Sequence, residues 1–511
     1  MSSKSRQLIV GSLLRICEYA VNVIAALILT PVIIQAVGDR LYGVWIFVGS
    51  FLGYYGLFEL GLDSAVKRFI ARAIGAKDFL EINRVFNTSL LIFSCIGLFI
   101  LFLTLVLSLF LPFIVPNVSD HESLFRILIL LVGLNYAISL PLKIFSGFLT
   151  ANMRFDVNTL VELSKTILRS ALIFLFLKHG FGILSLAVII LVTDSVSNLV
   201  KFVFIKKFYK ELSFSFNFFD KNKVKGLFSY SFISFINQIA EQLRFNVDNL
   251  VIVTILGFSQ LTTYSIGARL VKYFKDFVLS ATGMSMPLFS QYDGLKDYER
   301  IKEKYLFLTK INVYIGITFS AILLIFAKPF IRLWVGQQYS FAYIILILLL
   351  IPSFFEVVHY PGNGLLFGTS RHRFCAFLNI SEGVLNLILS FYFARRFGIA
   401  GVALGTAVPM VITKLFIQPI YMSHLVGISV RSLYSIILNK EFFLVVIITF
   451  SYYFLTSKLD IQSFFMIFLL SFFLGSILLL VLFILGFDNK EKKVVREAIL
   501  ITRSQLFKFA T

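Results

Sequence analysis

Charged side chains recur at helical spacing inside the most apolar stretches of this sequence. Spacings of three, four and seven residues place side chains on one face of a helix. A charge at the centre of a bilayer costs about 2.5–3.5 kcal/mol on insertion scales, so it usually faces a protein interior or a water-filled cavity. The pattern therefore predicts a polar chamber inside a membrane protein. Its basic candidates are Arg15, Lys165, Arg169, Arg244, Arg269 and Lys272, and its acidic candidates are Glu18, Glu162, Glu241 and Asp248.

The basic side chains in these stretches outnumber the acidic ones, which favours binding of an anion. Arg269 and Lys272 have no acidic residue within one turn if Asp276, at the end of the stretch, is set aside. Arginine suits phosphate because its planar fork binds two oxygens at once. The alternative is neutralisation along each helix by couples at i,i+3, namely Arg15–Glu18, Glu162–Lys165 and Glu241–Arg244.

Two further segments each allow two interpretations. Glu356 and His359 lie one turn apart and could form a proton-binding site or a structural polar contact. The basic stretch 64–77 could be an amphipathic helix lying among lipid headgroups or a landing surface for a lipid phosphate.

The elements that position these residues are helices long enough to cross a membrane. Apolar residues make up 58% of the 511 residues, and the mean hydropathy is +0.90. A membrane helix needs about 20 mostly apolar residues. We therefore predict an all-α polytopic membrane protein with about fourteen transmembrane helices and no soluble catalytic domain. The spans are expected near 8–36, 41–62, 85–112, 122–147, 157–178, 182–206, 229–256, 260–285, 305–327, 342–366, 374–394, 398–425, 441–457 and 461–487.

The distribution of basic residues predicts the orientation. The formal net charge is +20, and most Lys and Arg fall at the N-terminus, in alternate loops such as 201–225 and 296–310, and in the tail. By the positive-inside rule both termini are cytoplasmic and the first span, interrupted by Arg15 and Glu18, is an uncleaved helix. Topology and anionic headgroups account for the basic total, so no nucleic-acid partner is needed.

Four short matches recur in the same order in the two halves of the chain, at a nearly constant spacing. An even number of spans per period predicts a parallel repeat: two six-helix lobes related by a pseudo-twofold axis along the membrane normal, followed by two C-terminal helices. The expected divisions are 1–211, 212–428 and 429–511. The matches are Val37-Gly38 with Leu256-Gly257, Gly75–Asp78 with Gly294–Asp297, Ser146–Leu149 with Asn363–Leu366, and Phe181–Ala187 with Phe397–Ala403.

Metal and cofactor signals are absent from the sequence. The three cysteines are widely spaced and the five histidines do not cluster. Neither set has the spacing of a metal site or a disulfide framework, so no metal or cofactor is predicted.

Several stretches resemble the Wzx-type O-antigen/polysaccharide flippases. These form the polysaccharide transporter branch of the multidrug/oligosaccharidyl-lipid/polysaccharide exporter superfamily. The likeness extends over the whole chain, but its motifs are diffuse. They are Thr30-Pro31 with Val37-Gly38 and Tyr42–Trp45, Glu59–Asp63 with Lys67–Ala71, Asp248–Ile252 with Leu256-Gly257, Tyr264–Ile266 and Arg269-Leu270, and Phe397–Gly401.

The resemblance implies a two-lobed, V-shaped protein of the bacterial inner membrane that makes and breaks no bond. It would move undecaprenyl-pyrophosphate-linked O-antigen or related repeat units to the periplasmic leaflet. From the residues themselves we expect alternating access, and the candidates for ion coupling are Glu18, Glu162, Glu241, Asp248 and Glu356. Arg15 and Arg269 best match its cationic lumen. The implied partners are membrane lipids, an O-antigen polymerase and a chain-length regulator, with a monomeric protein. The alternatives are a peptidoglycan-precursor flippase, a cation-coupled multidrug exporter, or a membrane-embedded glycosyltransferase or polymerase.

Overall fold

The computed structural model describes residues 3–114, 122–228, 235, 238–239, 242, 246–282, 285–369, 371 and 373–496. Every regular element within these ranges is a helix, which confirms the predicted all-α class. The chain forms two compact units. Unit 1 is Met1–Thr262 with Ala394–Ile399, and unit 2 is Thr263–Phe393 with Ala400–Thr511.

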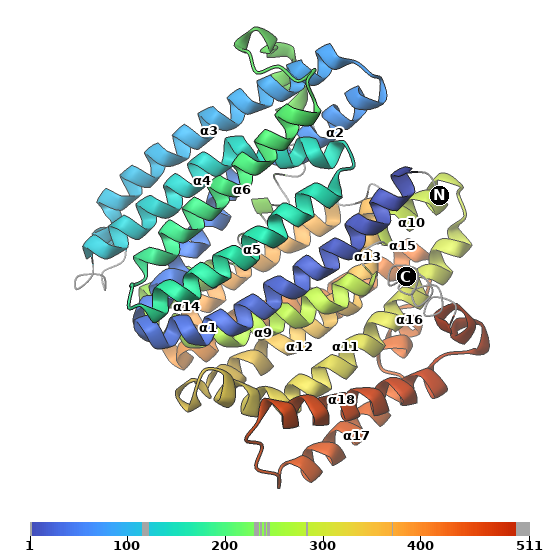
Figure 1. The fold of residues 1–511 in the computed structure, drawn as a ribbon. Helices are drawn as coiled ribbons and strands as arrows, with labels where there is room; N and C mark the ends of the chain where they lie inside the picture. Colours follow the sequence, from blue (N-terminus) through green and yellow to red (C-terminus); the bar gives the residue numbers. More distant parts are fainter. Residues whose placement is uncertain are drawn as a thin grey trace. The chain divides into compact units, whose positions relative to one another are not determined.

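Five long helices make up most of unit 1. They pack in the order α3, α4, α6, α5 and α1 along the bundle (Figure 1). Its elements are α1 (Ser3–Leu57), α2 (Leu62–Gly75), α3 (Phe79–Ile114), α4 (Glu122–Ala151), α5 (Phe155–Lys178), α6 (Leu184–Phe208), η2 (Phe216–Phe218) and α8 (Val247–Ile255).

The apolar face of α2 is buried inside unit 1. Leu62, Val66 and Ile70 join a core with Phe86 and Phe148, and α2 packs on α3 and α4. The expected amphipathic helix is therefore present, but its apolar side contacts protein. Packing on α3 and α4 accounts for the apolar side, and both interpretations of the basic side, a position among lipid headgroups or a landing surface for a lipid phosphate, stay predictions.

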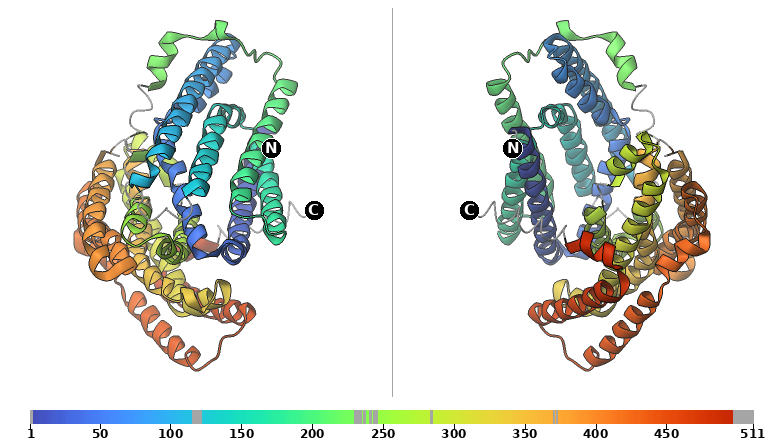
Figure 2. Two further views of the ribbon diagram at one scale, coloured as in Figure 1. Left: turned by 90° about the vertical axis from the view of Figure 1, so that its left-hand side faces the viewer. Right: turned by 90° about the vertical axis from the view of Figure 1, so that its right-hand side faces the viewer.

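Unit 2 holds the remaining helices. Figure 2 shows α17 and α18 as a pair joined by the turn that follows α17, and both pack on α11. The elements are α9 (Phe258–Thr282, whose first turn belongs to unit 1), α10 (Ser285–Gly294), α11 (Tyr298–Trp334), η3 (Gln337–Tyr339), α12 (Ala342–Val358), α13 (Tyr360–Gly368), α14 (Arg373–Val411), the π-helix η4 (Ile412–Ile417), α15 (Gln418–Val426), α16 (Val430–Ile437), α17 (Lys440–Thr456), α18 (Phe464–Val481) and the π-helix η5 (Leu482–Gly486).

Eight helices of the described residues are long and apolar enough to cross a membrane, or nine if the bent pair α12–α13 is one span. Two of them, Cys17–Leu57 and Arg373–Val426, each cover two of the predicted spans. Charged residues interrupt α5 and α9, and the predicted span 229–256 lies mostly outside the described residues. The count of fourteen stays a prediction.

The two merged helices leave helical geometry at glycines. Gly38 has φ 82° inside α1, and Gly398 has φ 58° inside α14. Both positions lie where the sequence predicted a break between two spans. Pro31 and Pro409 lie within the same helices but not at these breaks.

The repeated sequence motifs form turns with the same hydrogen bonds. The amides of Lys77 and Asp78 donate to Ile74 O and Ala73 O. At the matching turn of the second half, the amides of Lys296 and Asp297 donate to Asp293 O and Tyr292 O. Asp78 and Asp297 then cap the following helices through Oδ1, which accepts from the amides of Glu81 and Arg300.

A second pair of motifs behaves in the same way. The amide of Arg154 donates to Leu149 O, and that of Arg371, its counterpart in the second half, donates to Leu366 O. The match at Gly38 and Gly257 also holds, because both glycines have positive φ, 82° and 90°. The repeat thus extends from sequence to backbone geometry within each unit.

Candidate functional site

A chain of five charged side chains joins α5 to α6 inside unit 1. Glu162 binds both Lys165 and Lys201, and Lys165 also lies 3.2 Å from Asp194. The Arg169 Nη2 lies 2.6 Å from Asp194 Oδ1. The order along the chain is Lys201, Glu162, Lys165, Asp194 and Arg169, which we call the α5–α6 cluster.

Two uncharged groups complete the α5–α6 cluster. Asn135 on α4 donates its amide to Asp194 Oδ2 at 3.2 Å, and the Arg169 Nε donates to Thr193 Oγ1 at 3.0 Å. Three cations face two carboxylates, so the cluster carries one positive charge in excess. Mutual pairing lowers the cost of placing these groups in an apolar bundle. The excess charge leaves the cluster attractive to an anion.

Spacing explains why the two helices present these groups to each other. Glu162, Lys165 and Arg169 share one face of α5, and Asp194 and Lys201, seven residues apart, share one face of α6. The intrahelical Glu162–Lys165 couple is formed, as the neutralisation alternative expected. Lys165 and Arg169 are therefore paired cations rather than free anion ligands.

The sequence reasoning missed Asp194, Lys201 and Asn135. Lys201 was assigned to a cytoplasmic loop, which was wrong: it lies within α6 and is 2% exposed. The seven-residue spacing of Asp194 and Lys201 was the available signal. Helical spacing of the same kind had identified the polar face of α5.

On α1, one member of the predicted stripe contacts α5. The Thr166 hydroxyl donates to Asn22 Oδ1 at 3.1 Å. Asn22 lies one turn after Glu18, which is part-buried. The side chain of Arg15 lies outside the described residues. The polar faces predicted for α1 and α5 therefore meet in unit 1.

Most of the stripe predicted on span 229–256 lies outside the described residues, including Glu241 and Arg244. Asp248, at the start of α8, is 5% exposed. Next to it, the Tyr54 hydroxyl of α1 donates to Asn246 O at 3.0 Å. The beginning of α8 is thus tied to α1 within unit 1.

In unit 2, α9 carries the two cations expected to lack acidic partners. That expectation was wrong for Lys272, whose Nζ lies 2.7 Å from Asp276 Oδ2. The i,i+4 spacing places the two on one helix face, so Asp276 should not have been set aside. Lys272 is 66% exposed, so the pair is weak. Arg269, one turn earlier, is part-buried.

Glu356 on α12 pairs with Lys275 on α9. The Lys275 Nζ lies 3.2 Å from Glu356 Oε2, and both side chains are mostly buried. His359 is completely buried, and neither of its ring nitrogens has a hydrogen-bond partner among the described residues. Glu356 and His359 are therefore not joined by a hydrogen bond, and the polar contact that Glu356 makes is the ion pair with Lys275 of α9.

A second buried ion pair lies at the π-helix η4. The Lys414 Nζ is 2.9 Å from Glu382 Oε1, with side chains 5% and 1% exposed. The Thr413 hydroxyl donates to the same oxygen. Neither Glu382 nor Lys414 was a candidate, although each is a charge inside a predicted span. Among the described residues, no group of His, Cys, Asp and Glu side chains is arranged to hold a metal ion.

Comparison with known proteins assigns the chain to a family. Residues 11–293, more than half of the chain, match the family model described as "Polysaccharide biosynthesis protein". The chain belongs to this family. Residues 234–392 also match the model named MatE.

One relative matches this chain over nearly the whole of the relative's own length. The chain is 24% identical over 437 residues to the "Putative O-antigen transporter" of Shigella flexneri, covering 81% of this chain and 97% of the relative. This agrees with the resemblance drawn from the sequence motifs.

Solved structures share the fold. The lipid II flippase MurJ in an inward closed conformation has a TM-score of 0.72 at 18% identity, covering 93% of this chain and 97% of that one. An inward-facing multidrug resistance MATE transporter of the MOP superfamily has a TM-score of 0.69 at 17% identity, covering 80% and 94%. The chain is therefore a multi-span membrane protein with the fold of that superfamily.

Proposed function

We propose that this protein is a flippase that moves lipid-linked oligosaccharide repeat units of an O-antigen or related surface polysaccharide across the bacterial inner membrane. The observation that carries the proposal is the match to the O-antigen transporter relative over 97% of its length. Moving a lipid from one leaflet to the other makes and breaks no covalent bond, so the protein needs to supply only binding, shielding and a conformational change.

The substrate's undecaprenyl pyrophosphate is an anion, and the proposed lumen attracts it. The α5–α6 cluster, with one positive charge in excess, supports this role for Lys165 and Arg169. Arg15, Arg244, Arg269 and Lys272 are the further proposed contacts. In a low-dielectric interior a positive excess acts on a phosphate more strongly than it would in water.

Alternating access is the proposed mechanism, with 1–211 and 212–428 as lobes and 429–511 as an appendage. The repeated turns at Lys77 and Lys296 support two equivalent halves. Glu18, Glu162, Glu241, Asp248 and Glu356 are the proposed groups through which an ion could be coupled. Glu162 and Glu356 are engaged in ion pairs, so a proton or cation arriving there would have to displace a lysine.

The proposed setting is the inner membrane, with both termini cytoplasmic and a monomeric protein beside an O-antigen polymerase and a chain-length regulator. The basic stretches 206–225 and 296–310 support this orientation by the positive-inside rule.

The test is deletion of the gene followed by complementation, with surface polysaccharide as the readout. We expect loss of polymer and accumulation of undecaprenyl-linked repeat units on the cytoplasmic side, both reversed by the wild-type gene. Intact polysaccharide with altered drug sensitivity would instead identify a multidrug exporter. Arrest of peptidoglycan synthesis with accumulation of its lipid precursor would identify the second alternative.

A further inference from the structure

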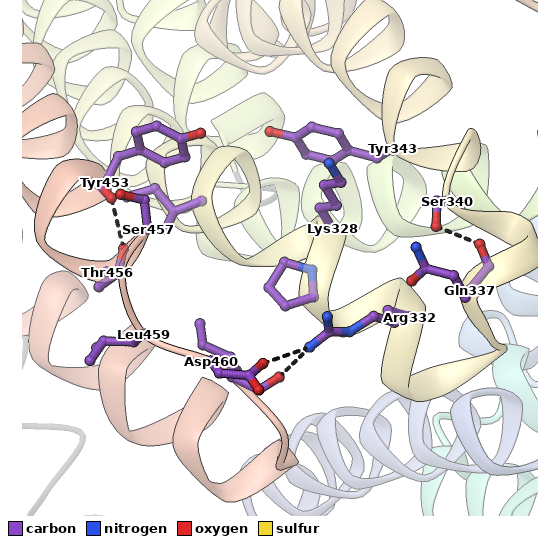
Figure 3. A pocket seen from close by; sticks show the side chains of 13 residues that line it. Lys328, Arg332, Gln337, Ser340, Tyr343, Tyr453, Thr456, Ser457, Leu459 and Asp460 are labelled. Carbon is purple, nitrogen blue, oxygen red and sulfur yellow. Dashed lines mark hydrogen bonds and ion pairs between the residues drawn. The ribbon is translucent and has the colours of Figure 1, made fainter.

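A cavity of about 440 Å³ lies within unit 2, between the C-terminal end of α11 and the C-terminal end of α17. Figure 3 shows Lys328, Arg332 and Tyr343 on one side of it and Tyr453 and Asp460 on the other. None of these residues belongs to the stripes from which the lumen was proposed.

The cavity carries a cation that no described residue neutralises. Arg332 is held in place, because its Nη2 donates to Ile461 O at 2.7 Å and lies 3.6 Å from Asp460 Oδ1. Lys328, one turn earlier on α11, has neither an ion pair nor a hydrogen bond from its ammonium group to any described residue. Like charges at i,i+4 repel each other. An anion bound between Lys328 and Arg332 would relieve that repulsion.

Uncharged donors surround the same space. The Tyr343 and Tyr453 hydroxyl groups point toward one another across the cavity (Figure 3). The Tyr343 hydroxyl donates to Leu324 O at 2.6 Å, so its oxygen can still accept. The side chains of Tyr453 and Gln337 have no hydrogen-bond partner among the described residues. Hydroxyl and amide groups beside an ammonium suit an oxyanion that also carries hydroxyl groups.

The position of the cavity matches the level of lipid phosphates. The 37 residues of α11 extend about 55 Å, longer than a hydrocarbon core about 30 Å thick, and the predicted span 305–327 ends directly before Lys328. The cavity lies near the end of α11 that is farther from the basic stretch 296–310. Tyrosines typically lie at this interfacial depth.

Adjoining apolar surface favours an amphiphile over a free sugar or inorganic anion. Val446 and Phe450 of α17 share a helix face with Tyr453 of the cavity, and they are 47% and 65% exposed. Both lie in a segment that meets the length and hydropathy of a membrane span. A hydrocarbon tail could lie along this surface while its headgroup enters the cavity.

We propose that this cavity binds the phosphate headgroup of a membrane lipid through Lys328 and Arg332, with Tyr343, Tyr453 and Gln337 contacting the rest of the headgroup. A phospholipid and the polyprenyl phosphate carrier share this chemistry. Binding at this site does not depend on the proposed function. The proposed orientation would place the site in the periplasmic leaflet.

The test is native mass spectrometry of the purified full-length protein, delipidated and then titrated with phosphatidylglycerol or, separately, zwitterionic phosphatidylcholine. We expect the wild type to retain phosphatidylglycerol preferentially and Lys328→Ala to weaken that retention about tenfold, as loss of one charge-assisted hydrogen bond implies. Lys328→Arg should restore it. The matched control is Lys178→Ala, which removes an exposed lysine at the end of α5, outside the cavity.

Equal retention by Lys328→Ala and Lys178→Ala, in protein that melts at the wild-type temperature, would overturn the proposal. So would equal binding of the two phospholipids by the wild type. Competition with undecaprenyl phosphate distinguishes the two sources. If undecaprenyl phosphate displaces bound phosphatidylglycerol when it is the less concentrated of the two lipids, the site is assigned to the carrier. If it must be in excess over phosphatidylglycerol, the site is assigned to bulk phospholipid. These measurements test lipid binding alone. A negative result would overturn the lipid site without bearing on the proposed function, which the gene deletion tests.

Discussion

Lys77 and Lys296 adopt the same left-handed backbone conformation, with φ of 55° and 56°, at equivalent positions of two matching turns. A non-glycine residue in this region costs roughly 1–2 kcal/mol. Each turn ends one helix and begins the next, through matching backbone hydrogen bonds and an aspartate cap. The two halves therefore share both the lysine and the unfavourable backbone conformation that it adopts in the turn.

Replacing either lysine with glycine should stabilise the protein. Glycine adopts positive φ without a steric cost, so Lys77→Gly and Lys296→Gly should each raise the free energy of unfolding by about 0.5–1 kcal/mol. The two turns lie in different units, so the double variant should show the sum. Thermal unfolding in detergent measures this.

The control is Lys77→Ala, which removes the side chain but keeps the positive φ, and it should give no gain. If Lys77→Ala stabilises the protein as much as Lys77→Gly, the lysine side chain and not the backbone is the source of the strain.

Lys201 holds one end of the α5–α6 cluster, so removing it should destabilise unit 1. Lys201→Met should cost up to about 3 kcal/mol, the lower end for breaking a buried pair, because Glu162 keeps Lys165 as a partner. The double variant Glu162→Gln, Lys201→Met should recover part of the loss. Melting temperature in detergent is the readout, and Lys210→Met, an exposed lysine beyond the end of α6, is the control. A double variant less stable than Lys201→Met would contradict the pairing.

Helical periodicity predicted which faces of the helices are polar, but not which helices face each other. The stripe on α5 was readable because its charges are three and four residues apart on one helix. Its partners Asp194 and Lys201 lie on the following helix, and only packing of α6 on α5 brings them together. Pairing across helices is a tertiary property, so the sequence overestimated the unpaired positive charge.

The same limit explains the result at Glu356. Residues one turn apart on a helix were expected to interact, but the neighbouring helix α9 supplied Lys275 at 3.2 Å. By contrast, Gly38 and Gly398 lie where the sequence predicted a break between two spans, because glycine ends regular geometry locally. Local chemistry was predictable, and long-range contacts were not.

The Arg154–Asp156 pair at the start of α5 predicts a small dependence of stability on pH. Partial burial alone would raise the pKa of Asp156, but hydrogen bonds from the Arg154 guanidinium, at 3.0 Å, and from the backbone hold it below its usual value. A pKa lowered by folding stabilises the folded state above the unfolded-state pKa, and this stabilisation is lost as the pH falls through the lowered pKa.

The variant Asp156→Asn should therefore lower the free energy of unfolding by about 0.2–1 kcal/mol at pH 7, the range for a solvent-exposed pair. The difference from wild type should shrink steadily as the pH is lowered from 5 to 3. Parallel melts at several pH values check this, with Glu211→Gln as the control, because Glu211 is exposed and its carboxylate pairs with no described residue. A difference that persists unchanged at pH 3 would mean that Asp156 acts through packing and not through its charge.

Among the cations proposed to line the lumen, Arg269 is the one on which the proposed function makes its sharpest prediction. It lies on α9, part-buried, one turn before the exposed Lys272 that Asp276 pairs. If its guanidinium contacts the pyrophosphate, Arg269→Ala should reduce surface polysaccharide by at least about tenfold, the loss expected for one charge-assisted contact. Arg269→Lys should restore part of it, because lysine keeps the charge but loses the bidentate geometry.

Polysaccharide display per molecule of membrane protein, quantified by immunoblot, separates loss of transport from poor folding. Arg300→Ala, which removes an exposed arginine at the start of α11, should behave as wild type. Normal display by Arg269→Ala at native expression would remove this residue from the substrate path.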